Sequence, residues 1–381
     1  MMSTVMRACY LLVAALSVVA MAVTGYAYLT LDEFREGVNT TPALDDIPNP
    51  PPPDDGAEDI LLVGTDSRTD AKGNPLPPAM LKMLRTEAKA GVNTDTLIVL
   101  RLPRDDGPPR AVSLPRDSWV DLPGGGQGKI NSAFNAAKVA EAERLVDKGR
   151  QSRAQIELAS DEKGRQALVQ TVQDFTKVRV DHYAEVSLLG FYLLTEALGG
   201  VEVCLAAATS DADSGANFAA GRQTISGGEA LSYVRQRKNL PRGDLDRIVR
   251  QQTFLGSALH KVLSADTLAN RGKLDKLVDA VERSVVLDPD LDILEFARKA
   301  RGLASGDVKF VTIPVETING TSPDGKQSIV QVDPGKVRKF VRSLVRHEPN
   351  GSGGGSAPGA ASAARQDDGE PITGGRAPCV N

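Results

Sequence analysis

The chain has 381 residues, a net charge of −4, an isoelectric point near 5.6 and an aromatic content of 4%. This length allows one large domain or two small ones, and the apolar fraction of 41% is enough for a sizeable core. The acidic balance argues against a general DNA-binding protein, and the scarcity of aromatic rings argues against a surface that stacks single-stranded nucleic acid. We therefore expect no nucleic-acid partner.

The first predicted element is a transmembrane helix. Residues 8–31 are almost entirely apolar, carry no charge and are long enough to cross a bilayer. Arg7 precedes this run and acidic residues follow it, so the positive-inside rule places residues 1–7 in the cytoplasm and the rest outside. A cleaved signal peptide is the alternative, with residues 25–27 as a poor cleavage site. We favour an uncleaved anchor, which predicts a single-pass protein of the cell membrane with an extracytoplasmic domain.

Two segments of biased composition enclose the predicted globular domain. Residues 32–58 are rich in Pro and Asp, which is typical of a stiff, solvated linker. Residues 348–381 form a tail rich in Gly, Ala and Ser, a composition that indicates flexibility. Between them, residues 59–347 are expected to form one domain.

Within this domain, short apolar runs alternate with helical patterns. Runs bounded by Gly, Pro and charged residues predict strands at 60–63, 96–100, 111–114, 180–186, 201–205, 308–313 and 328–332. Helical patterns occur at 133–148, 165–176, 188–198, 244–263, 273–284, 291–300 and 334–345. Strands mixed with helices of this length predict an α/β sandwich around a central sheet, whose strand order the sequence leaves open.

Acidic residues follow or begin three of the predicted strands. Asp66 and Asp95 sit at strand ends, where paired carboxylates could hold Mg²⁺, a hard ion that prefers oxygen ligands. The simpler alternatives are an Asx-turn at Asp66 and a cap at Asp95. Arg116 and Asp117 come just after a third strand, and the alternative there is a surface salt bridge.

An arginine-rich run at residues 233–252, YVRQRKNLPRGDLDRIVRQQ, stands out in this acidic chain. Arginine is the side chain best shaped for bidentate contact with phosphate, so the run predicts a site for a phosphorylated ligand. A solvated, charged helix face is the alternative. Three of its cations are expected at the solvated surface: Lys238, Arg242 and Arg250.

The remaining side chains of the run are expected to converge at the start of a helix. Asp244 is suited to be its N-cap. Arg247 and Gln251 are four residues apart and share one helix face. Arg235 and Arg237 are two apart on a segment that we expect to be extended, so both can point to the same side.

Two cysteines lie in the part of the chain predicted to be outside the membrane. Disulfides persist in such compartments, so Cys204 and Cys379 could pair and tie the tail to the domain. The alternative is a buried Cys204 and a free thiol in the tail.

Five motifs, taken in order, resemble the LytR–CpsA–Psr family. They are GTDSR (64–68), NTDTL (93–97), SLPRD (113–117), KINSAF (129–134) and the distal YVRQR…GDLDRIVRQQ. Each motif by itself is weak evidence for the family, but the five motifs in this order, behind one apolar N-terminal segment, are a specific signature. The resemblance extends from about residue 59 to about residue 345, and the C-terminal sequence APCVN resembles actinobacterial members.

The resemblance implies a fold and an activity. The fold is an α/β/α sandwich with a central mixed sheet and an apolar, polyprenyl-binding tunnel. The activity is that of an extracytoplasmic phosphotransferase, which moves a glycopolymer such as arabinogalactan or a teichoic-acid-like polymer from a polyprenyl-pyrophosphate carrier to peptidoglycan.

Site residues follow from the same motifs. Asp66 and Asp95 would hold Mg²⁺ (or Mn²⁺) and activate the acceptor, and Arg116 would join them as a catalytic residue. The pyrophosphate would contact further residues of the motifs: Arg68, Arg116, Asp117, Arg235, Arg237, Arg247 and Gln251. Among these, Asp117 would steady Arg116.

The chain departs from the family pattern after the KIN motif. Many members carry a Gly pair there, whereas residues 135–148 read as an Ala-rich helix, which changes the expected shape of the acceptor entrance.

Two other functions remain open: a polyprenyl-pyrophosphate phosphatase that uses water as the nucleophile, and a non-catalytic regulator of cell-envelope assembly. Dependence of lipid phosphate release on a peptidoglycan acceptor separates transfer from hydrolysis, and inactivation by Arg116→Ala separates an enzyme from a regulator.

Overall fold

The structure is a computed structural model that describes residues 37–53, 56–88, 91–104, 107–149, 151–268, 270–292, 308–344 and 378–381. Its strands are β1 (Asn39–Thr40), β2 (Ala57–Thr65), β3 (Thr94–Pro103), β4 (Arg110–Ser113), β5 (Trp119–Asp121), β6 (Gln127–Lys129), β7 (His182–Val186), β8 (Val201–Leu205), β9 (Thr209–Asp211), β10 (Ala216–Phe218), β11 (Gly221–Ile225), β12 (Val285–Leu287), β13 (Lys309–Thr312), β14 (Thr317–Thr321), β15 (Ser328–Gln331) and β16 (Cys379–Val380). Its helices are α2 (Pro78–Met83), α3 (Ser132–Lys148), α4 (Arg153–Thr176), α5 (Leu188–Ala197), α6 (Gly227–Arg235), α7 (Asp244–Val262), α8 (Ala265–Leu268), α9 (Arg271–Ser284) and α11 (Pro334–Ser343).

A central sheet of seven strands organises the molecule, in the order β1-β12-β7-β2-β3-β4-β13. Parallel and antiparallel pairs are mixed: β2 runs parallel to β7 and antiparallel to β3, and β4 runs antiparallel to β3 and parallel to β13. Neighbours in the sheet include segments far apart in sequence, because β2 pairs with a strand more than a hundred residues later. The predicted mixed sheet is therefore confirmed, and the structure supplies the strand order.

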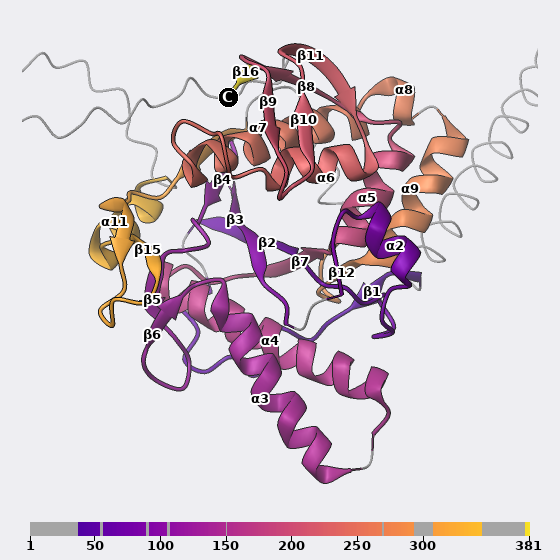
Figure 1. Ribbon diagram of the computed structural model, residues 1–381. Coiled ribbons are helices and arrows are strands. Elements are labelled where there is room, and N and C mark those ends of the chain that lie inside the picture. The colour runs from indigo at the N-terminus through magenta and orange to yellow at the C-terminus, as the bar shows by residue number, and fades with distance from the viewer. Residues whose placement is uncertain are drawn as a thin grey trace, which may run out of the picture.

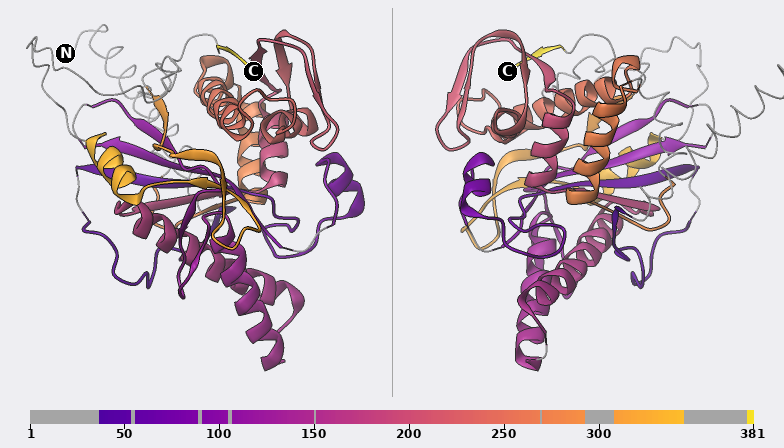
Figure 2. Two further views of the ribbon diagram at one scale, coloured as in Figure 1. Left: turned by 60° about the vertical axis from the view of Figure 1, so that its left-hand side comes forward. Right: turned by 90° about the vertical axis from the view of Figure 1, so that its right-hand side faces the viewer.

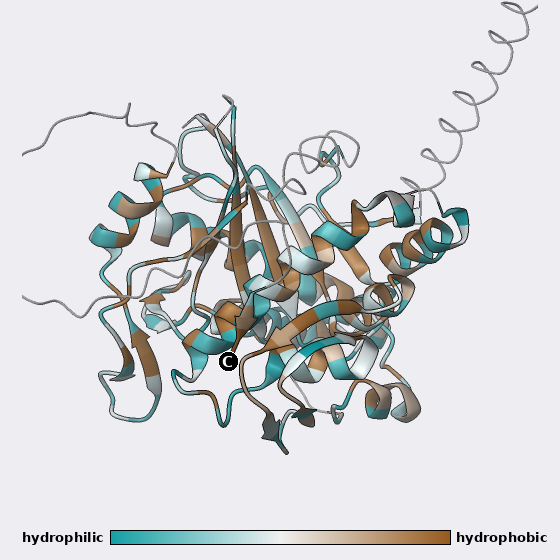
Figure 3. Cartoon of the chain, turned by 90° about the horizontal axis from the view of Figure 1, so that it is seen from above, coloured by the Kyte–Doolittle hydropathy of each residue, from teal (hydrophilic) through white to brown (hydrophobic). Residues whose placement is uncertain are grey.

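Helices cover both faces of this sheet (Figure 1). On one face Leu61 and Val63 of β2 pack with Leu168 and Val172 of α4. On the other face Ile60 packs in a cluster that also contains residues of α7. The alternation of β2 side chains between faces is the two-residue period of a strand, and it produces the α/β/α layers. Figure 3 shows the central strands as brown, apolar ribbons between teal and mixed helices.

The α3–α4 pair projects away from the body of the molecule (Figure 2). Helix α4 begins twelve residues earlier than predicted, because Ser152 and Gln155 form a capping box at its start. Lys138 of α3 is buried between the two helices and contacts Asp161 and Glu157 of α4. An ion-pair cluster therefore joins the two helices.

The segment expected to be a solvated linker contributes to the core instead. Asn39 and Thr40 form β1 at the edge of the sheet, where they pair with β12. Ala43 is fully buried in the main core, and β2 already begins at Ala57. The Pro-rich composition concealed these contacts because they depend on a strand almost 250 residues later.

Several other expectations concern the ends of the chain. The predicted helix at 291–300 lies almost wholly outside the described residues, as do the cytoplasmic segment 1–7 and the membrane segment 8–31. Across the part of the chain that the structure describes, no helix is both long and apolar enough to span a bilayer.

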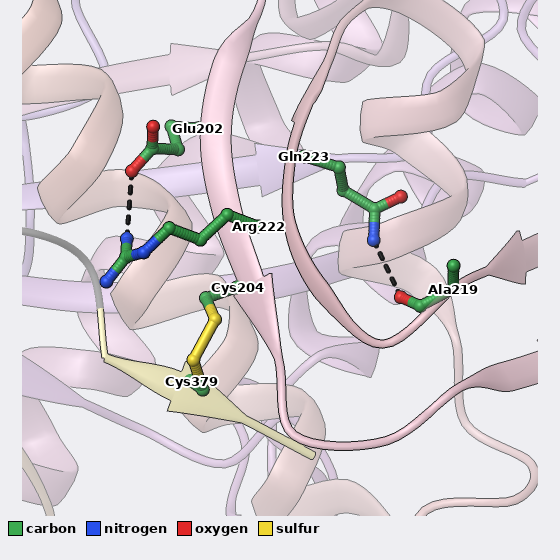
Figure 4. The surroundings of a disulfide bond; sticks show 6 residues. All are labelled: Glu202, Cys204, Ala219, Arg222, Gln223 and Cys379. Atoms are coloured by element: carbon green, nitrogen blue, oxygen red, sulfur yellow. Dashed lines mark hydrogen bonds and ion pairs between the residues drawn. A yellow bond between two sulfur atoms is a disulfide. The ribbon is translucent and has the colours of Figure 1, made fainter.

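The end of the predicted tail is attached to the domain. Cys379 forms a disulfide with Cys204 on β8 (Figure 4), so the pairing alternative holds and the free-thiol alternative does not. Strand β16 pairs in parallel with β8, and Ala206 N donates to the carbonyl oxygen of Val380 at 2.8 Å. The last residues of the chain are thus part of a three-stranded sheet, β11-β8-β16.

Candidate active site

Two of the predicted acidic turns lie side by side where β2 ends and β3 begins. Asn93 N donates to Asp66 Oδ1 at 2.6 Å, and Asn93 Nδ2 donates to Asp66 Oδ2 at 3.2 Å. Arg68 folds back on the same carboxylate, with Nη1 3.4 Å from Asp66 Oδ2. Asp66 is therefore held from a neighbouring segment, and Asp95 lies within β3 instead of capping an element.

Arg116 is surrounded by three carboxylates. Its Nη1 donates to Asp95 Oδ1, and its Nε lies 3.6 Å from Asp117 Oδ2 and 4.0 Å from Asp244 Oδ1. Burial opposes the charge of this guanidinium, but Asp95, Asp117 and Asp244 outweigh burial and raise the pKa of Arg116. Arg116 is thus a permanent cation fixed at the centre of the cluster.

Asp117 connects Arg116 to a second group of cations. Lys129 Nζ lies 3.0 Å from Asp117 Oδ1, and Arg237 Nη2 lies 3.8 Å from Asp117 Oδ2. Although burial alone would favour the neutral acid, Arg116 and Lys129 hold the pKa of Asp117 below its usual range. The geometry agrees with the expectation that Asp117 steadies Arg116.

Arg247 on α7 belongs to the same cluster. Its Nη2 lies 2.6 Å from Asp244 Oδ1, and its side chain is only 4% exposed. Burial and the nearby charge of Arg116 lower the pKa of Arg247 to about 10, against the attraction of Asp244 and Asp95. The expected role of Asp244 as N-cap is wrong: Gly243, at φ +57°, holds that position, and Asp244 is the first residue of the helix.

Two buried N–H groups of the cluster have no acceptor among the described residues. The Nε atoms of Arg116 and Arg247 are both buried without a hydrogen-bond partner there. Buried donors in proteins nearly always find an acceptor, so such pairs mark places where a ligand or water completes the bonding. Phosphate oxygens are well suited to satisfy guanidinium groups.

Arg235 and Gln251 reach the cluster from two helices. Arg235 is the last residue of α6, so the expectation that it lies on an extended segment with Arg237 is wrong. Its pKa is lowered by burial, against the attraction of Asp95 and Asp66. Gln251 Nε2 donates to the carbonyl oxygen of Val234 at 3.2 Å, which ties α7 to α6.

The three cations expected at the surface differ in their placement. Lys238 and Arg242 are exposed and pair with Asp213 and Asp246. Arg250, in contrast, is 1% exposed, so its expected solvation is wrong. It donates to Gln236 Oε1 at 2.7 Å and to the carbonyl oxygen of Asn381, and its guanidinium lies 5.1 Å from the centre of the Tyr233 ring.

An apolar cavity of about 430 Å³ opens from this cluster between the sheet and helices α5, α6, α7 and α9. Four residues of the charged region also line it: Asp66, Asp95, Arg235 and Gln251. Most of its other lining residues are aliphatic or aromatic, among them Leu188, Phe191, Leu194, Phe254, Leu259 and Phe310. The same site thus joins an arginine-rich, charged cluster to an apolar cavity. Within residues 188–198, the apolar side chains of Leu188, Phe191, Leu194 and Leu198 line it.

Two members of the cluster were not predicted as site residues. Lys129 belongs to the KINSAF motif, whose presence could have identified it. Asp244 bridges Arg116 and Arg247, but its sequence context suggested only a helix cap. In the described parts of the chain, no group of three or more His, Cys, Asp or Glu side chains is arranged to hold a metal ion.

Comparison with protein families gives one clear match. The model of the LytR_cpsA_psr family matches residues 35–342. The cell wall biosynthesis protein LcpA of Corynebacterium glutamicum is 50% identical over 291 residues, which cover 76% of this chain and 56% of LcpA. A polyisoprenyl-teichoic acid–peptidoglycan teichoic acid transferase, TagU of Oceanobacillus iheyensis, is 30% identical over 69% of each chain. The chain thus spans just over half the length of LcpA.

Solved structures share the fold. Bacillus subtilis TagV superimposes with a TM-score of 0.54 at 23% identity, over 78% of this chain and all of TagV. A LytR-Csp2A-Psr enzyme of Actinomyces oris has a TM-score of 0.53 at 19% identity, over 81% of this chain and 96% of that enzyme. At sequence identities below 25%, the structural similarity establishes the fold alone.

Proposed function

The chain belongs to the LytR–CpsA–Psr family, and we propose that it is a phosphotransferase that attaches a glycopolymer from a polyprenyl-pyrophosphate carrier to peptidoglycan. The observation that carries this proposal is the junction of the arginine cluster with the apolar cavity. A polyprenyl pyrophosphate has the same two parts, a multiply charged head and an apolar chain. The name of the relative TagU describes a transfer of this kind, from a polyisoprenyl carrier to peptidoglycan.

In this proposal the arginines hold the pyrophosphate. Arg116 and Arg247 offer buried Nε donors that lack acceptors among the described residues, and phosphate oxygens would satisfy both. Arg235 lines the cavity and would contact the phosphate next to it, whereas Arg68, near Asp66, and Arg237, near Asp117, would contact it from outside the cavity lining. Phosphoryl transfer depends mainly on positioning and on charge neutralisation, which is what such a cluster supplies.

The reaction breaks one P–O bond and forms another. A hydroxyl oxygen of the peptidoglycan acceptor attacks the phosphorus that carries the glycopolymer. The bridging P–O bond breaks, and the polyprenyl phosphate leaves with the electron pair. We assign the acceptor proton to Asp95, whose side chain is 32% exposed against 15% for Asp66.

Asp66 and Asp95 also fit a divalent cation. Both line the cavity next to the arginines, and carboxylate oxygens are the ligands that Mg²⁺ or Mn²⁺ prefers. Mg²⁺ is commonly bound through one or two carboxylates plus substrate phosphates, which suits a site without a larger ligand cluster. When bound, the ion would supply charge neutralisation at the phosphate oxygens.

We further propose that the domain works on the outer side of the cytoplasmic membrane, anchored by residues 8–31. The disulfide between Cys204 and Cys379 supports this placement, because such bonds persist in oxidising compartments.

The test is a transfer assay with purified protein, a polyprenyl-pyrophosphate-linked oligosaccharide and peptidoglycan. We expect polymer on the peptidoglycan and release of polyprenyl phosphate that depends on the acceptor, with both lost in EDTA and restored by Mg²⁺ or Mn²⁺. Release at the same rate without acceptor, and with no polymer attached, would show a phosphatase instead.

A further inference from the structure

A second cavity, of about 470 Å³, lies where β5, β6, β15 and α11 come together on one side of the molecule (Figure 1). Its lining combines two aromatic residues, Trp119 and Phe175, with polar side chains that include Asp121, Gln127, Asp174, Thr321 and Arg338. The proposed phosphotransferase chemistry uses none of these residues.

The indole of Trp119 is held by a chain of hydrogen bonds along the β5–β6 hairpin. Trp119 Nε1 donates to Gln127 Oε1 at 3.1 Å, and Gln127 Nε2 donates to Asp121 Oδ1 at 3.0 Å. Asp121 and Gln127 are both exposed, so their remaining lone pairs and N–H groups face solvent. The hairpin therefore presents a fixed aromatic ring next to free hydrogen-bonding groups.

This cavity is close to the arginine cluster. Trp119 follows Arg116 by three residues, and three residues of chain span at most about 11 Å. Lys129, which contacts Asp117, is the strand partner of Trp119. On the cavity's other wall, Val330 N donates to the carbonyl oxygen of Asp117 at 2.9 Å. The cavity and the cluster thus share one rigid framework.

The charge of the cavity does not suit a phosphate. Asp121 and Asp174 contribute carboxylates. Its one guanidinium, Arg338, already donates to the carbonyl oxygens of Phe175 and Asp174, at 3.1 and 3.0 Å. An uncharged ligand with hydroxyl groups fits better, because carboxylate, amide and hydroxyl groups all bond to hydroxyls. The face of an indole ring carries the negative side of its quadrupole, so it attracts the C–H groups on the face of a sugar ring.

We propose that this cavity is a saccharide subsite, in which a sugar ring stacks on Trp119 and its hydroxyls bond to Asp121 and Gln127. This inference rests on the proposed function, since both the peptidoglycan acceptor and the transferred polymer are glycans that extend beyond the phosphate. The subsite orients that glycan relative to the reacting phosphorus. Both sources contain uncharged sugar rings of the required chemistry, which in peptidoglycan are the N-acetylglucosamine units.

Binding can be followed by the intrinsic fluorescence of Trp119, the single tryptophan of the chain. The full-length protein is titrated separately with an N-acetylglucosamine–N-acetylmuramic acid oligomer and with an arabinogalactan-derived oligosaccharide. We expect a saturable change in emission with one of them, and the one that binds identifies the source of the glycan. No saturable change with either oligosaccharide overturns the proposal.

Variants separate this subsite from the phosphate site. Gln127→Ala keeps the fluorescent reporter and should weaken saccharide binding roughly tenfold, as hot-spot residues do. Gln223→Ala on β11 is the matched control and should bind as the parent protein does. Trp119→Ala, followed by calorimetry, should lose at least as much affinity as Gln127→Ala; unchanged affinity in both variants overturns the proposal.

The two proposals fail independently. Saccharide binding is measured without a lipid carrier, so it does not depend on transfer. If Arg247→Ala transfers polymer normally while Gln127→Ala loses saccharide binding, the phosphate-site assignment fails and the subsite stands. If Arg247→Ala is inactive while Gln127→Ala and Trp119→Ala bind normally, the subsite alone fails.

Discussion

Arg247 is a buried cation for which the described chain supplies only part of the bonding. Asp244 pairs with its Nη2, but its Nε is buried without an acceptor among the described residues. Burial and the charge of Arg116 lower its pKa to about 10, so it stays protonated at neutral pH. A dianionic or trianionic ligand would relieve the repulsion between these two guanidinium groups, which is why Arg247 is the residue that we test first.

Replacing Arg247 with alanine should lower the rate of polymer transfer by about 10² to 10³, the usual loss when one preorganised donor is removed from a transition-state site. Arg247→Lys should recover only part of the rate, because an ammonium group lacks the planar fork. The transfer assay measures the rates, and thermal unfolding verifies that each variant is folded.

Arg222→Ala serves as the matched control for this change. Arg222 lies on β11 and pairs with the exposed Glu202 at 2.9 Å, so it should be replaceable with full activity. Full transfer activity in Arg247→Ala would contradict the site assignment.

At the residue scale, prediction from the sequence relied on side chains whose own type suggests a role. The arginines and the two aspartates were predicted because their chemistry suits phosphate and metal ions, and the structure brings them together in one cluster. Asp244 was predicted to be a helix cap, because its position at the start of a helical pattern suggests that local role. Its contact with Arg116, which is more than a hundred residues away in sequence, leaves no local signal. Arg250 was assigned to the surface because its burial depends on Asn381, which arrives from the other end of the domain.

At the scale of elements, the α3–α4 pair carries a buried titrating group. Asp161 on α4 is 7% exposed, and burial raises its pKa to about 6 despite the attraction of Lys138 and Arg165. The folded state therefore binds this proton more tightly than the unfolded chain does. Its contribution to stability is complete below about pH 4 and is lost as the pH rises through about 6.

The variant Asp161→Asn removes this titration. We expect the free energy of unfolding of the parent protein to fall, relative to the variant, by about 3 kcal/mol between pH 4 and pH 7. Urea unfolding at several pH values measures the difference. If the free energies of unfolding of the two proteins differ by the same amount at every pH in this range, the prediction for Asp161 is wrong.

Helices α5 and α7 form the other side of the apolar cavity, so their packing should control lipid binding. Ala258 on α7 lines the cavity, and Ala258→Trp would fill part of its volume. We expect polyprenyl phosphate to co-purify with the parent protein and to be absent from the variant, as measured by mass spectrometry of extracted lipids.

The control for this change is Ala140→Trp, at an exposed position of α3. It adds the same side chain without entering the cavity and should retain the lipid. Equal amounts of lipid in both variants would place the polyprenyl chain elsewhere.

Sequence patterns located six of the nine described helices, and α6 is among those that they missed. Its sequence opens on Gly227 and Gly228, which are poor helix formers, and the segment that carries Arg235 and Arg237 was expected to be extended. The helix forms because Ala230 and Tyr233 are buried in the cluster that also contains Phe254 of α7. Tertiary packing overrides a weak local propensity here.

At the scale of the whole molecule, the end of the chain is joined to the helix that carries Arg247. The disulfide ties Cys379 to β8, and the side chain of Arg250 on α7 donates to the carbonyl oxygen of Asn381. The disulfide connects residues 175 positions apart, so it restricts the unfolded chain strongly.

Reduction of this disulfide should lower the free energy of unfolding by about 2–5 kcal/mol. Calorimetry with and without dithiothreitol measures the shift in melting temperature. A Cys204→Ala/Cys379→Ala double variant should melt at the lower temperature under both conditions; a parent protein that does not respond to the reductant would contradict the prediction.

By itself the sequence determined the α/β class, six of the nine described helices and seven of the sixteen described strands, and it predicted the residue types of a phosphate site. These properties are local, because the period of apolar residues and the chemistry of a side chain can be read over a few positions. Only the tertiary structure decided the strand order, the burial of Arg250, the bridge made by Asp244 and the cavity next to Arg235. Each of these depends on contacts between segments distant in sequence, and a contact of this kind leaves no periodic signal in either segment.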